Sequence, residues 1–131
     1  MGIERFASES RYEPSVGYSR AVRAGPLVLV AGTTATGPDG ELVGEGSLYL
    51  QARQALRNVE RALAEAGVGL ADVVQTRLYV TEIARWEEVG RAHGEVFGKI
   101  RPVTAMVEVS ALIDPRMLVE IEATAWTGGS P

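Results

Sequence analysis

The stretch RPVTAMVEV, residues 101–109, alternates apolar and polar side chains after a boundary marked by proline. A second alternating stretch, VEIEATA at residues 119–125, follows after a short turn. Alternation with a period of two predicts two strands, each with one buried face and one open face. Because carboxylates are costly to bury, Glu108, Glu120 and Glu122 are expected to face water, a partner or a ligand. We therefore expect the functional surface to lie along these two strands.

The rest of the chain supplies the elements that surround these strands. Apolar periodicity and turn residues predict an edge strand or arm, a strand hairpin, a long helix, a strand and a second helix. Their expected ranges, in the same order, are residues 1–14, 18–22 with 27–31, 50–66, 73–80 and 86–97. Ser47 is the expected N-cap of the long helix and Gly67 its stop. The helical spacing places Gln51 and Gln54 on the polar outer face of this helix.

Two helices can cover only one face of a mixed sheet of five or six strands. A chain of 131 residues fits one domain with a core of its own, and we assign residues 1–131 to a single α+β domain. The second face of the sheet is then bare. It predicts association with further copies of the chain.

The composition argues against several classes of protein. With a formal net charge of −4, the chain has no basic surface for nucleic acid. The absence of cysteine rules out disulfides, thiolate zinc sites and cysteine nucleophiles, and one histidine leaves little to hold a metal. We expect no cofactor and no metal. The N-terminal segment lacks the apolar core of a secretion signal, and the longest apolar run, residues 27–31, is too short to span a bilayer. We therefore expect a cytoplasmic protein that does not bind membranes.

Several segments also carry a resemblance to a known family. The clearest are QARQALRNVERALAEAG (51–67), DVVQTRLYVT (72–81), VEVSAL (107–112), VEIEATA (119–125), YSRAV (18–22) and LVLVAG (27–32). In this order they resemble the Rid (YjgF-type) family of enamine/imine deaminases over nearly the whole chain. The resemblance implies a chorismate-mutase-like fold. It also implies a homotrimer whose sheets form a central barrel, with ligand clefts between subunits.

The resemblance also assigns roles to individual residues. Tyr18 matches the tyrosine of the family's cleft, and Gly32 matches a strand-end glycine whose backbone lines the pocket. Glu120 matches the glutamate associated with the reacting water, which is a general acid/base role. The chain departs from the family at Gly17, where a proline is usual, and at Gly90, where a polar asparagine is usual.

A further departure concerns the substrate. Deaminating members have Pro-x-Arg before the Val-Glu-Val run, and that arginine holds the substrate carboxylate; here Thr104 takes its place. A threonine hydroxyl can donate one neutral hydrogen bond but cannot compensate a carboxylate's charge. Two other arginines are candidates to bind the substrate carboxylate instead. Arg20 lies on the same strand face as Tyr18, and Arg101 lies beside the turn at Pro102.

Each of these residues also has a structural interpretation that the sequence leaves open. Glu120 can line a solvated barrel or join an interface ion pair, Tyr18 can be a core aromatic, and Thr104 can be inert. His93 lies on the apolar stripe of its helix, which favours a packed or interface histidine over a catalytic one. For Glu108 we favour a structural role.

The resulting functional prediction is a Rid-like hydrolase or deaminase. Its substrate is a small enamine, imine or related metabolite that differs from the usual 2-imino acids because Thr104 replaces the arginine. The alternative is a non-catalytic trimer that binds a small molecule or a protein partner in the same clefts. A chorismate mutase is disfavoured, because its dicarboxylate substrate needs an arginine cluster that the sequence lacks.

Overall fold

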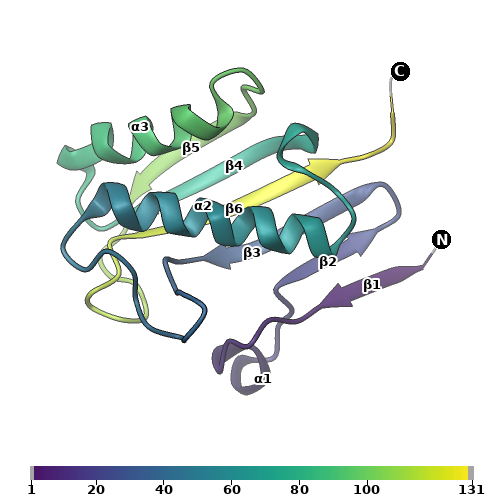
Figure 1. Cartoon of the computed structure of the whole chain (residues 1–131), viewed down its shortest axis with the longest axis horizontal. Helices are drawn as coiled ribbons and strands as arrows, with labels where there is room; N and C mark the ends of the chain where they lie inside the picture. The colour runs from purple at the N-terminus through teal and green to yellow at the C-terminus, as the bar shows by residue number, and fades with distance from the viewer. Residues whose placement is uncertain (1, 130–131) are drawn as a thin grey trace.

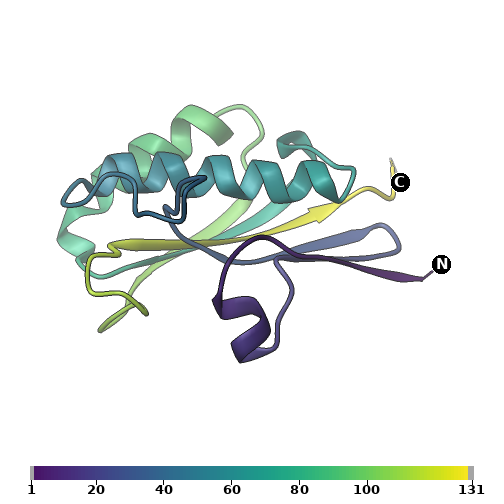
Figure 2. The same ribbon diagram turned by 60° about the horizontal axis from the view of Figure 1, so that its bottom comes forward.

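A computed structural model of the protein describes residues 2–129, in which a six-stranded sheet carries two long helices on one face (Figures 1 and 2). The strands are β1 (Ile3–Phe6), β2 (Ala21–Ala24), β3 (Leu27–Thr33), β4 (Val73–Val80), β5 (Val103–Glu108) and β6 (Val119–Trp126). The helices are α1 (Tyr12–Val16), α2 (Leu48–Glu65) and α3 (Trp86–Phe97), with short 3-10 turns η1 (Leu70–Asp72) and η2 (Ile83–Arg85). The α+β fold expected from the sequence is confirmed.

The strands do not follow chain order across the sheet. The spatial order is β1-β2-β3-β6-β4-β5, and only β4 and β5 run parallel. A parallel pair needs a crossover connection, which α3 provides, and this connection puts β5 at the edge of the sheet. The two alternating stretches that predict strands are therefore not neighbours, because β4 lies between them.

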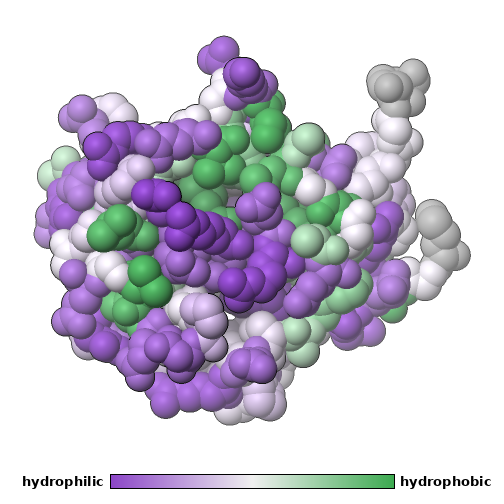
Figure 3. Space-filling view, in the orientation of Figure 1, coloured by the Kyte–Doolittle hydropathy of each residue, from purple (hydrophilic) through white to green (hydrophobic). Residues whose placement is uncertain are grey.

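Helix α2 forms where its sequence signals predict. The Ser47 side chain accepts a hydrogen bond from the Leu50 backbone N–H at 3.2 Å, and the chain leaves the helix at Gly67 with a φ of +83°. A positive φ is cheap only for glycine, which explains the stop. Hydrophilic side chains run along the outer face of α2 (Figure 3).

The placement of Gln51 and Gln54 on that outer face is wrong, since both are buried. The Gln51 amide donates to the carbonyls of Gly44 (3.3 Å) and Arg116 (3.0 Å). Its oxygen accepts from the Leu118 backbone N–H at 2.9 Å. Gln51 faces inward because three backbone groups of two loops need a polar partner there.

The N-terminal region differs from its prediction in two ways. The strand expected from Tyr18 begins only at Ala21, and residues 12–16 form the short helix α1. Pro14 does not prevent this helix, because proline is tolerated in a first turn, where its missing N–H has no helical partner. The strand expected within residues 1–14 is confirmed as β1. In α3, the helical spacing also predicts Trp86 on the apolar stripe with Val89 and Phe97, but Trp86 is 54% exposed.

The core lies between the helices and the sheet. The inward-facing side chains of the central strands, among them Val28, Leu78 and Ile121, are almost completely buried against α2 and α3. Neither α2 nor α3 covers the opposite face, where only the short helix α1 lies within residues 2–129 (Figure 2), and apolar side chains such as Leu29 and Trp126 are exposed there. No helix in this part of the chain combines the length and apolar character that crossing a membrane requires.

Candidate functional site

Glu120 projects from β6 on the sheet face away from the long helices and lies directly against Gly32 of β3. A Cβ atom added to Gly32 would sit 2.6 Å from the Glu120 Oε2 atom, which is closer than real contacts allow. The pairing of β3 with β6 shifts register between Val30 and Thr33, around this glycine. Only a residue without a side chain leaves room for the carboxylate at this position.

Arg20 connects the glycine to Tyr18. Its Nη2 atom donates a hydrogen bond to the Gly32 carbonyl oxygen at 2.9 Å. Its guanidinium carbon lies 5.6 Å from the centre of the Tyr18 ring, a cation–π distance. Its Nε atom lies 3.9 Å from Oε2 of Glu13, a buried carboxylate that also accepts from the Ser8 backbone N–H. Four predicted site residues, Tyr18, Arg20, Gly32 and Glu120, are therefore brought together.

The surroundings of Glu120 shift the pKa of its carboxyl upward. Burial raises the pKa of the Glu120 carboxyl, and the neighbouring Glu122 raises it further, while the Arg20 guanidinium opposes them. A carboxyl whose pKa is moved towards neutrality can both take and return a proton. A substrate carboxylate at Arg20 would share the guanidinium with the Gly32 carbonyl and with Glu13.

Thr104 lies elsewhere in the chain. The Thr76 hydroxyl, on the helix-facing side of β4, donates to the Thr104 oxygen at 2.8 Å, so Thr104 also points to that side. His93 Nε2 lies 2.8 Å from the Thr76 oxygen, and its ring packs on Phe97 with centroids 4.8 Å apart. Thr104 and Glu120 are thus on opposite faces of the sheet, on strands that β4 separates. Within one chain the structure does not bring them together.

Comparisons with known proteins identify the family of the chain. Residues 8–127 match the family described as Endoribonuclease L-PSP. The chain belongs to this family. Among similar solved structures is Rv2704 of Mycobacterium tuberculosis, a member of the YjgF/YER057c/UK114 family, with a TM-score of 0.86 and 58% identity over 95% of this chain and 99% of that one. The protein SCO2049 of Streptomyces coelicolor is 43% identical over 126 residues, 96% of this chain and 93% of its own length.

A third relative carries an activity in its name. The 3-aminoacrylate deaminase RutC of Acinetobacter baylyi is 28% identical over 125 residues, which cover 95% of this chain and 98% of that protein. These matches confirm the expected membership of the YjgF/RutC/Rid family and its fold.

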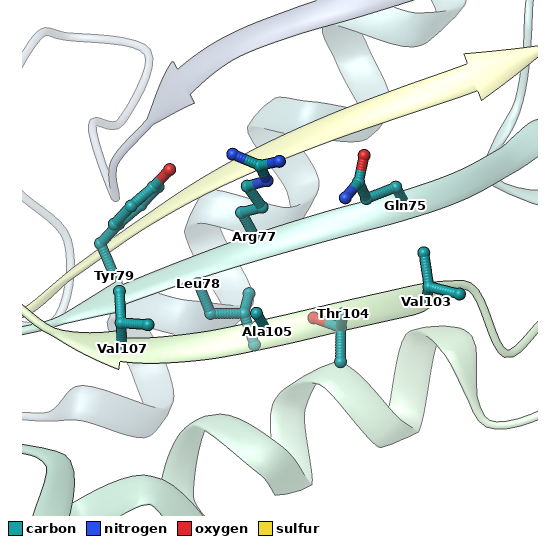
Figure 4. Close-up of a pocket in the computed structure, with 8 residues that line it drawn as sticks. All are labelled: Gln75, Arg77, Leu78, Tyr79, Val103, Thr104, Ala105 and Val107. Carbon is teal, nitrogen blue, oxygen red and sulfur yellow. The ribbon is translucent and has the colours of Figure 1, made fainter.

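The Rid-family chain also has a hollow along the edge of its sheet that the sequence did not single out. It measures about 370 Å³ and lies between β4 and β5. Figure 4 shows the residues that line it: Gln75, Arg77, Leu78, Tyr79, Val103, Thr104, Ala105 and Val107. The sequence feature that could have indicated this hollow is the alternation in VVQTRLYV, residues 73–80, because it puts Gln75, Arg77 and Tyr79 on one face.

The remaining acidic residues make structural contacts. Glu108 accepts a hydrogen bond from the Ile83 backbone N–H at 3.0 Å, which supports the structural role expected for it. Glu122 accepts from the Tyr79 hydroxyl, and this bond raises the pKa of Tyr79. Within residues 2–129, no three histidine or acidic side chains are grouped closely enough to hold a metal ion.

Proposed function

We propose that this protein is a hydrolase of the deaminase type that acts on a small enamine or imine. The observation that carries the proposal is the Glu120 carboxyl, held against the Gly32 backbone with a pKa raised by burial and by Glu122. Arg20 and Tyr18 border the same position. Membership of a family that includes a 3-aminoacrylate deaminase supports the same reaction class.

In the proposed reaction, water adds to the carbon of a C=N bond. The imine enters protonated on nitrogen; Glu120 as carboxylate takes a proton from the water while the new C–O bond forms, and the electron pair of the C=N bond moves to nitrogen to give a neutral carbinolamine. Glu120 then gives this proton to the amine nitrogen, the C–N bond breaks with loss of ammonia, and the hydroxyl proton passes to solvent as the carbonyl product forms. An enamine enters the same sequence after its carbon is protonated to give the imine.

We further propose that the active cleft forms between subunits of a homotrimer. Glu120 and Thr104 lie on opposite faces of one chain, so a ligand that contacts both needs a second copy. The bare sheet face supports this assembly, because its exposed apolar residues gain most from being covered. Light scattering is expected to give three times the chain mass of 14.0 kDa. A monomer mass would contradict the proposal.

The direct test of the activity is Glu120→Gln. With small imines and enamines other than 2-imino acids generated in situ, we expect the wild type to release ammonia above the spontaneous rate. The substitution should lower kcat by about 10²–10⁴-fold, the usual contribution of a general acid/base. Glu4→Gln, a matched change on the exposed edge strand β1, should leave the rate unchanged. Turnover that survives Glu120→Gln would remove the mechanism.

A second candidate function is supported by Thr104. A neutral residue where deaminating members have arginine fits a trimer that binds a metabolite or a protein partner without turnover. Thermal-shift screening against small carboxylates, keto acids, amides and heterocycles separates the two. Stabilisation by a ligand together with no ammonia release from any imine would favour the binding protein.

A further inference from the structure

Three side chains from three different elements form a continuous hydrogen-bonded chain. His93 of α3, Thr76 of β4 and Thr104 of β5 are joined by two contacts of 2.8 Å each. Thr76 is 1% exposed and His93 is half-buried, whereas Thr104 is exposed. The chain therefore runs from the interior of the molecule to the surface at the edge of the sheet.

The direction of this chain follows from counting hydrogens. A threonine hydroxyl has one hydrogen, and Thr76 donates it to Thr104. Thr76 must then accept from His93, which fixes the histidine as the tautomer with hydrogen on Nε2. The Thr104 hydroxyl keeps its own hydrogen, and within residues 2–129 it makes no other hydrogen bond. A chain aligned in this way strengthens each donor along it, so Thr104 is a polarised donor facing outward.

The three side chains of the hydrogen-bonded chain carry no charge of their own. Burial lowers the pKa of His93, so its ring is neutral at physiological pH. Arg77 is adjacent to Ala105 in the β4–β5 register, but it projects with Gln75 and Tyr79 from the opposite face of the sheet (Figure 4). Arg101 lies ahead of β5, exposed, with a backbone φ of +57°.

We propose that Thr104 forms the contact point of an uncharged subsite that selects a neutral polar group of the ligand, such as an amide or ketone carbonyl, over a carboxylate. A single neutral donor satisfies a carbonyl oxygen fully, whereas a carboxylate placed there loses hydration without gaining a counter-charge. Thr76 and His93 are positioning residues that act through Thr104. The inference rests on the proposed function and narrows its substrate to uncharged imines and enamines.

Two stable ketone ligands of matched size test this selectivity: pyruvamide and pyruvate. Binding to the wild-type protein, measured by NMR titration, should favour pyruvamide by about tenfold or more. Thr104→Val should weaken pyruvamide binding by about 5–10-fold, and Thr104→Ser, which keeps the hydroxyl, should restore it. Thr104→Arg should reverse the preference towards pyruvate.

The positioning role has a separate readout. His93→Gln keeps an N–H donor near Thr76 and should retain pyruvamide affinity, whereas His93→Phe should lower it by several-fold. Nitrogen chemical shifts of the wild-type imidazole should report hydrogen on Nε2. The opposite tautomer, or equal affinities for the two His93 variants, would remove the proposed chain.

The failure of this inference is distinguishable from that of the proposed function. Pyruvate binding as tightly as pyruvamide, absent pyruvamide binding or an unchanged Thr104→Val variant each overturn the uncharged subsite. Pyruvate binding that Arg101→Ala abolishes would likewise overturn it and assign the charge to Arg101. In each case, Glu120-dependent release of ammonia from 3-aminoacrylate would leave the proposed reaction standing.

Discussion

Replacing Gln51 with methionine tests how the start of β6, and with it Glu120, is held in place. Gln51 is completely buried on α2, and its amide is the hydrogen-bond partner of three backbone groups. One of them is the N–H of Leu118, two residues before Glu120. Methionine keeps the unbranched shape of the side chain and removes every one of these bonds.

The expected loss of stability follows from those three bonds. Each net hydrogen bond contributes about 1 kcal/mol, and an unpaired buried group costs about 1–3 kcal/mol. The greater hydrophobicity of methionine offsets part of this cost. We expect the free energy of unfolding to fall by about 3 kcal/mol, which for a domain of this size lowers Tm by roughly 10 °C.

The assay is urea unfolding at a fixed protein concentration, because association of subunits makes apparent stability depend on concentration. Gln54→Met is the matched control. Gln54 is also buried on α2, but it makes a single hydrogen bond, to Asn58 Oδ1 at 3.0 Å. Its replacement should cost about 1 kcal/mol. A Gln51→Met loss no larger than that of Gln54→Met would refute the reasoning.

Three further outcomes concern the site and α3. A Cβ at position 32 would sit 2.6 Å from the Glu120 Oε2 atom, so Gly32→Ala should push that oxygen away to at least 3.4 Å, the distance of ordinary contact. Turnover should then fall about 10²-fold while the free energy of unfolding in urea changes little. An unaltered kcat would count against the close packing. Gly94→Ala adds a Cβ that meets nothing within 4 Å inside a helix and should raise the free energy of unfolding by about 0.5–1 kcal/mol, and a loss would contradict this. Burial lowers the pKa of His93 below its ordinary 6.5. The stability that the neutral His93 ring contributes is therefore complete above about pH 6.5 and is lost as pH falls through the lowered pKa of the folded protein. The wild type should therefore lose more stability than His93→Gln between pH 7.5 and pH 5, and a constant difference would argue against a neutral buried ring.

Periodicity in the sequence predicted most of the elements but not how they are arranged. The alternation in 101–109 and 119–125 correctly indicated β5 and β6. It contained no information on their separation by β4, because strand order depends on the crossover through α3. Alternation likewise shows which residues share a face, but not which face the helices cover. The sequence therefore did not reveal that Thr104 and Glu120 lie on opposite sides.

The errors at polar residues have a different cause. Gln51 and Gln54 were assigned to the outer face of α2 because amides are usually exposed, and only the position of the loops explains why they are buried. Tyr18, Gly32 and Glu120 were grouped through the family resemblance, since they come from three distant segments. The part that no pattern contained is the His93–Thr76–Thr104 chain, which requires three elements to be placed in space.

The central position of β6 has a consequence for how the protein is made. β6 contributes the ladders to both β3 and β4, yet it follows every other strand in the chain. While ribosomes translate the first hundred or so residues, β1–β3 and β4–β5 lack the strand that joins them in the finished sheet. Helix α2 can then pack against only part of that sheet. The sheet can close only after residues 119–126 have emerged from the ribosome. Until then, the edges of β3 and β4 remain open to pairing with other chains.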